Sequence, residues 1–130
     1  MKMIIIAPLL SLLMAMANPA NVPEWKQIEQ AFATGNATRL SAYFAPTVTL
    51  SVEGNKGNFS NRQARSIMQD FFSQHPPKSF AVKNTGTTGK SSPYYLCTYE
   101  SSKGARYSAY ILFVTGSGKS LISHITFEKN

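Results

Sequence analysis

Two side chains of this sequence could act as a general acid or base in an apolar pocket: Asp70 and His124. An apolar wall shifts the proton affinity of a carboxylate or an imidazole towards neutral pH, where such catalysis operates. Asp70 lies one step off an apolar helical stripe, which favours a solvated carboxylate. His124 shares a strand face with Ile122 and Thr126, which favours a packed or partly exposed histidine. Neither forms a recognisable catalytic pair, so the sequence assigns no catalytic residue and favours a protein that is not an enzyme.

The sequence also contains no clear motif for phosphate binding, metal binding or thiol chemistry. Residues 89–91 and 118–120 read Gly-Lys-Ser, but both lack the first glycine of a phosphate-binding loop and lead into strands rather than a helix. His75 and His124 are the two histidines, and no carboxylate stands at ligand spacing from them. Cys97 is the single cysteine, and its apolar and aromatic neighbours favour a small buried residue over a reactive thiol. We therefore predict no metal and no cofactor.

The charge of the chain is its most general surface property. Thirteen Lys and Arg residues stand against six Asp and Glu residues, giving a formal net charge of +7. Such a balance favours contact with anionic surfaces, so docking on an anionic envelope polymer or lipid is kept as one alternative function. The basic residues are spread along the chain without interleaved aromatics, and we therefore expect no nucleic-acid partner.

The first residues have the pattern of a secretion signal. Lys2 provides the positive start, residues 4–14 form an apolar run, and residues 15–17 read Ala-Met-Ala, a small-residue cleavage site. The run is shorter than the roughly 20 apolar residues that a membrane span needs, so no stable span is expected. The sequence predicts a signal peptide over residues 1–17 and a single domain over residues 18–130, exported to the periplasm or the extracellular space.

Two helices are predicted at the start of this domain. The first takes Asn21 as its cap, carries apolar residues at helical spacing and ends at Gly35. The second is capped by Asn36, runs through Phe44 and is ended by Pro46. Both are amphipathic, so they must cover an apolar surface.

A hairpin and a third helix follow. Residues 47–53 alternate between apolar and polar side chains, and a glycine-containing turn returns the chain into a brief partner strand at residues 58–59. Ser60 followed by Gln63 is a capping box, and the apolar stripe behind it ends before Pro76.

The rest of the chain has the two-residue period of strands. A strand near residues 79–83 is followed by a polar loop and by a meander with strands at residues 94–101, 106–115 and 120–128. Both faces of residues 107–114 are largely apolar. One face can pack on the helices, and the other then needs a cover.

The order of helices, hairpin, helix and meander resembles the α+β cone fold of NTF2-like, cystatin-related proteins. The matching positions are Trp25, Ile28, Ala31, Phe32, Gly35, Asn36, Leu40, Phe44, residues 54–59, residues 60–64, Phe71, Phe72, Gly104 and Tyr107. Together they resemble a family of small secreted NTF2-like proteins of Gram-negative bacteria that is known only as a domain of unknown function. The resemblance implies a curved antiparallel sheet with three helices over one face, and a fold of this kind supports no particular activity.

A cone of this shape usually leaves a pocket between the helices and the sheet. The residues expected to line it are Trp25, Phe32, Tyr43, Phe71, Tyr94, Tyr107 and Ile111. The sequence therefore favours a non-enzymatic binding or scaffold module for a small amphipathic ligand or a peptide. An isomerase or dehydratase of the ketosteroid-isomerase kind stays open as an alternative on analogy of fold, with Asp70 or His124 as its acid or base.

The two-sided apolar strands also predict a homodimer. If Ile111 and Phe113 face the helices, the opposite face presents an apolar patch that a second copy would bury. The residues assigned to this dimer face are Tyr95, Cys97, Tyr99, Tyr110, Leu112 and Val114.

Overall fold

The computed structural model describes residues 21–89, 91–116 and 118–130, which form three helices and six strands. The helices are α2 (Trp25–Thr34), α3 (Ala37–Ser41) and α4 (Asn61–Gln74). The strands are β1 (Phe44–Val52), β2 (Asn55–Ser60), β3 (Pro77–Thr87), β4 (Pro93–Ser101), β5 (Arg106–Gly116) and β6 (Lys119–Lys129). The predicted signal peptide, residues 1–17, lies outside the described residues, as does Lys90 of the first Gly-Lys-Ser turn.

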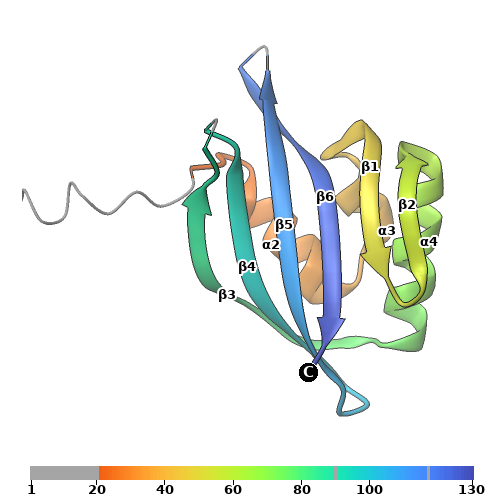
Figure 1. Ribbon diagram of the computed structural model, residues 1–130. Helices are drawn as coiled ribbons and strands as arrows, with labels where there is room; N and C mark the ends of the chain where they lie inside the picture. The colour runs from red at the N-terminus through yellow and green to blue at the C-terminus, as the bar shows by residue number, and fades with distance from the viewer. Residues whose placement is uncertain (1–20, 90, 117) are drawn as a thin grey trace, which may run out of the picture.

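The strands form one curved sheet in the order β2-β1-β6-β5-β4-β3, and the helices lie behind it in the view of Figure 1. The predicted α+β architecture with helices over one face is confirmed. Neighbouring strands are antiparallel except for β1 and β6, which are parallel. The expectation of a wholly antiparallel sheet is therefore wrong at this one pair. A parallel pair needs a long connection, and here the chain from β2 to β5 provides it.

Helix α2 begins later than the sequence suggests. Its N-cap is Glu24, which makes no side-chain capping bond, so the assignment of Asn21 as the cap is wrong. Its predicted end is confirmed. Gly35 takes the left-handed conformation with φ 67°, and its N–H turns back to the carbonyls of Ala31 and Phe32. Glycine adopts this conformation without steric cost.

Helix α3 is shorter than predicted. Asn36 caps it as expected, with its side-chain oxygen 3.0 Å from the Arg39 N–H. The helix ends at Ser41, however, and Phe44 already belongs to β1, where it pairs with Ile122. The Ile122 N–H donates to the Tyr43 carbonyl at 2.8 Å. Pairing with β6, which comes from the far end of the chain, thus overrides the local helical spacing.

The hairpin and α4 follow the prediction more closely. The turn lies at Glu53 and Gly54, both with positive φ (48° and 86°), which is the backbone of a tight two-residue hairpin. The capping box of α4 is confirmed. Ser60 Oγ accepts from the Gln63 N–H at 3.2 Å, and Gln63 Oε1 accepts from the Ser60 N–H at 3.0 Å. Helix α4 buries Ala64, Met68, Phe71 and Phe72 against the sheet.

Strand β3 is longer than the sequence suggests. It continues to Thr87 through residues that were expected to form a loop, and it pairs with β4 along its length. A register shift between Val82 and Asn84 lets the polar segment stay in the sheet. The three later strands appear within one residue of their predicted ends.

Candidate functional site

Aromatic side chains of the chain itself fill the space between the helices and the inner face of the sheet. Phe32 of α2 stacks on Phe80 of β3 with ring centroids 4.7 Å apart. Phe71 of α4 lies 4.7 Å from Phe127 of β6. All four rings are buried. The region where the sequence places a ligand pocket is therefore occupied by close-packed protein atoms.

Most of the predicted pocket residues belong to this packed interior. They are Trp25, Phe32, Phe71, Tyr107 and Ile111. Trp25 is partly buried because it stacks on Tyr95, with centroids 3.8 Å apart. Tyr43 is half-buried beside Leu121, at a surface hollow of about 110 Å³.

Tyr94 lies on the other side of the sheet. It pairs with Leu112, whereas its neighbour Tyr95 pairs with the buried Ile111. Successive side chains of a strand point to opposite faces, so Tyr94 belongs to the outer face, away from the helices. Its side chain lies over Gly86 of β3, where an added Cβ would come within 2.9 Å of the hydroxyl oxygen and two ring carbons. The assignment of Tyr94 to the cone is therefore wrong.

The two acid–base candidates are separated by the sheet. Asp70 is exposed on α4, on the helical side. His124 is half-buried on the outer face, where it pairs with Leu112 and Thr49 and where its Nδ1 lies 2.9 Å from Ser123 Oγ. A register shift near Ser123 puts His124 and Ile122 on opposite faces, contrary to the sequence assignment. Asp70 and His124 therefore cannot act together on one substrate.

A cluster that the sequence did not indicate surrounds Glu53 in the hairpin turn. Its Oε2 accepts a hydrogen bond from the Tyr107 hydroxyl at 3.2 Å, and its Oε1 lies 3.3 Å from His75 Nε2. The Tyr99 hydroxyl donates to the His75 carbonyl. Burial, with the charge and the hydrogen bond of Glu53, raises the pKa of Tyr107. The cluster ties the turn after β1 to the end of α4.

Asp70 and Glu53 line one hollow of about 150 Å³ next to this cluster. Glutamate is an unusual residue at positive φ, and its position directly before Gly54 in the turn is the one sequence signal for the cluster. His75 follows the end of α4, and no spacing rule connects it to Glu53, 22 residues earlier. Only the fold brings these residues together.

The outer face of the sheet carries an apolar patch that none of the three described helices covers. We call this set of residues the outer patch: Tyr94, Leu96, Tyr110, Leu112 and Val114. Val114 is 47% exposed and the other four are half-buried. The rings of Tyr94 and Tyr110 lie 5.6 Å apart across neighbouring strands. Three members, Tyr110, Leu112 and Val114, lie on the predicted face, away from the helices.

The other predicted dimer-face residues lie inside the protein, and their assignment is wrong. Tyr95 and Tyr99 pair with Ile111 and Tyr107, and Cys97 lies between them on the same face. All three are at most 5% exposed. Burial, with a smaller effect of Glu29, raises the pKa of the Cys97 thiol to about 12. This agrees with a small packed residue and not with a reactive thiol.

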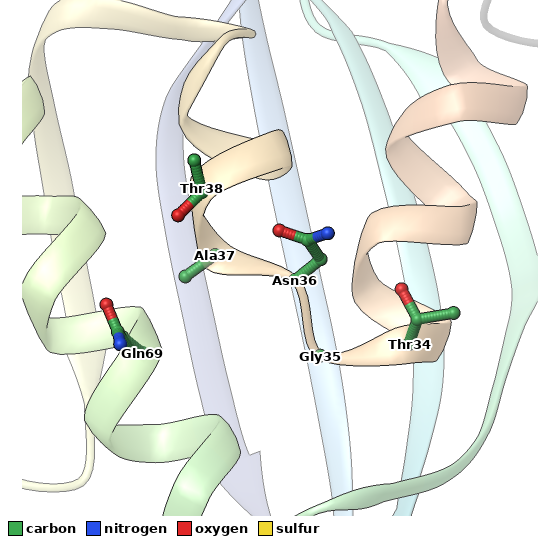
Figure 2. A pocket seen from close by; sticks show the side chains of 6 residues that line it. All are labelled: Thr34, Gly35, Asn36, Ala37, Thr38 and Gln69. Atoms are coloured by element: carbon green, nitrogen blue, oxygen red, sulfur yellow. The ribbon is translucent and has the colours of Figure 1, made fainter.

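A polar hollow of about 280 Å³ lies where α2 turns into α3 beside α4 (Figure 2). It is lined by Thr34, Gly35, Asn36, Ala37, Thr38 and Gln69. The backbone explains its key residues, because a Cβ at Gly35 would lie 3.1 Å from Pro77 Cδ and because Asn36 caps α3. We assign no ligand to it.

Metal binding and membrane spanning are two further properties that the described part of the chain allows one to assess. Within residues 21–89, 91–116 and 118–130, no three His, Cys, Asp or Glu side chains gather as metal ligands would. Over the same residues, every helix is too short or too polar to cross a membrane.

Comparison with known proteins extends over most of the chain. A family model described as a domain of unknown function (DUF4783) matches residues 25–128. A DUF4783 family protein from Bacteroides uniformis is 26% identical, with a TM-score of 0.75 over 85% of this chain and 98% of that chain. One from Bacteroides ovatus is 24% identical, with a TM-score of 0.74 over 80% and 93% of the two chains.

The fold has relatives outside that family. An NTF2-like protein of unknown function from Shewanella baltica is 12% identical, with a TM-score of 0.59 over 82% of this chain and 87% of that chain. At this identity the likeness shows the fold alone, and the fold is NTF2-like, as the sequence resemblance implied. No protein with a curated description matches the chain.

Proposed function

We propose that this chain, which belongs to the DUF4783 family, is an exported, non-enzymatic scaffold module that docks through the outer face of its sheet, with a second copy of itself as partner. The observation that carries this proposal is the outer patch on β4 and β5. The inner face of the same strands is closed by the protein's own helices. Among residues 21–89, 91–116 and 118–130, no helix covers the five side chains of the outer patch.

Physical reasons favour a second copy over water as the neighbour of this patch. Soluble monomers rarely keep a contiguous apolar surface exposed. A twofold axis through the patch would set the same side chains against each other, so the surface is complementary to itself. A stable interface needs roughly 800 Å² from each partner, so the contact would extend from the outer patch onto the neighbouring strands of the same face.

The export in this proposal rests on the signal pattern of residues 1–17. The absence of enzymatic activity in this proposal rests on the separation of Asp70 from His124 and on the aromatic side chains that fill the interior between the helices and the sheet. Docking through the outer patch, in contrast, requires no acid–base residue.

Sedimentation velocity at tens of micromolar tests the proposal. The wild-type protein should sediment as a dimer. Leu112→Glu should give monomers, because a carboxylate in the centre of the patch would lose its hydration in the dimer. Ser51→Glu is the matched control: it adds the same charge on the outer face of β1, opposite Lys56, outside the patch. A wild-type monomer at this concentration, or dimers of Leu112→Glu, would refute the proposal.

A further inference from the structure

An apolar groove lies outside the cone, whose interior is filled by the protein's own side chains. It lies at the edge of the molecule between β2 and α4, which Figure 1 shows next to each other. Its lining residues are Phe59, Arg62, Gln63, Ser66 and Ile67. Its volume is about 410 Å³, and it is a shallow hollow that is open to solvent over most of its surface.

The floor of the groove consists of apolar side chains. Phe59 and Ile67 are only partly buried, so each packs on the core with one side and faces the groove with the other. The Phe59 ring lies beside Gly57, at ordinary van der Waals distance from the position that a Cβ would take there. Gln63 is held by its bond to the Ser60 N–H and is therefore turned towards the helix cap. The surface that remains for a ligand is mainly apolar.

One end of the groove is cationic. Arg62 is exposed there, and the first turn of α4 contains no acidic residue. In the described part of the chain the ion pairs are Glu53 with His75 and Glu100 with Arg106, so Arg62 has no carboxylate partner among those residues. A guanidinium beside an apolar surface suits a carboxylate or phosphate group joined to a hydrocarbon.

We propose that this groove binds a single-chain anionic amphiphile. The anionic head pairs with Arg62, and the hydrocarbon chain lies over Phe59 and Ile67. The groove lies on β2 and α4 and the outer patch on β4 and β5, so the ligand and the second copy do not compete. This proposal is therefore independent of dimerisation.

Isothermal titration calorimetry with dodecanoate below its micellar concentration tests the site. Each methylene buried in the groove should raise the affinity about fourfold, so dodecanoate should bind more tightly than octanoate. Dodecyl maltoside, which has the same chain and no charge, should bind at least about tenfold more weakly than dodecanoate.

Variants locate the binding. Ser66→Trp fills the groove from an exposed position and should abolish dodecanoate binding without unfolding the protein. Arg62→Ala should weaken binding about tenfold, while Arg65→Ala, one turn away on α4 and outside the lining, should leave it unchanged.

Three results would overturn the proposal. They are equal binding of the neutral and the anionic amphiphile, dodecanoate binding that Ser66→Trp does not alter, and a lack of dodecanoate binding below the micellar concentration. A change of sedimentation in Ser66→Trp would instead mean that a second copy covers the groove, and would likewise reject it.

Discussion

The two faces of β4 carry tyrosines with opposite surroundings. Tyr95 and Tyr99 point inward and are at most 5% exposed, packed by Trp25, Phe71 and Phe72 from the helices. Tyr94 points outward and meets Tyr110 on the open face. The same residue type therefore forms the core on one face and a half-exposed patch on the other. The difference is the cover: in the part of the chain that the structure describes, the helices pack on the inner face and leave the outer face open.

Removal of an aromatic ring from the inner face should have the largest effect on the free energy of unfolding. Phe32→Ala should lower the free energy of unfolding by about 3–5 kcal/mol, because it leaves a cavity between Phe72, Phe80 and Phe127. Thr98→Ala, on the outer face next to Leu96 at the edge of the patch, should change it by less than about 0.5 kcal/mol. Urea unfolding measures both. Equal effects of the two substitutions would mean that the interior is not packed as described.

The tyrosine hydroxyl groups allow a second comparison of stability between the inner and the outer face. Tyr107→Phe removes the inner hydrogen bond to Glu53 and should cost about 1 kcal/mol of unfolding free energy, a modest value because Glu53 is partly exposed to water. Tyr110→Phe, on the outer face, should cost less. If Tyr110→Phe were the more destabilising of the two in chemical denaturation, the inner cluster would have no structural role.

Alkaline pH should lower the stability of the protein through the buried Cys97 thiol on the inner face. Burial raises the pKa of Cys97 from 9.0 to about 12, so the folded protein keeps the thiol proton over a range in which the unfolded chain releases it. The folded state then binds more protons, and stability falls as pH rises from about 9 to about 12. Urea unfolding at several pH values should show this decline, and Cys97→Ala should reduce its slope. An unchanged slope would show that the thiol does not contribute.

Local patterns predicted the helices and turns that depend on local interactions. The capping box at Ser60 and Gln63, the cap at Asn36 and the end of α2 at Gly35 are all confirmed, because each is decided within a few residues. Phe44 was misassigned to a helix, since its conformation is set by pairing with Ile122, far along the chain.

The faces of the sheet were harder to predict for the same reason. Alternation within β4 separates Tyr94 from Tyr95, but only the register with β5 decides which of the two faces the helices. A register shift after Leu112 also reverses the alternation of β6, so that His124 lies on the outer face and Ile122 on the inner face. The Glu53 cluster joins three elements through the hairpin turn, and no single stretch of sequence contains it.

Oxidative footprinting by hydroxyl radicals, read by mass spectrometry, tests most directly whether the outer patch is a docking face. Labelling of Tyr94, Tyr110 and Leu112 should decrease between about 1 µM and about 100 µM protein as the dimer forms. Tyr43, which is half-buried outside the patch, should be labelled equally at both concentrations. Labelling of the outer patch that does not depend on concentration, while the protein stays folded, would contradict the account.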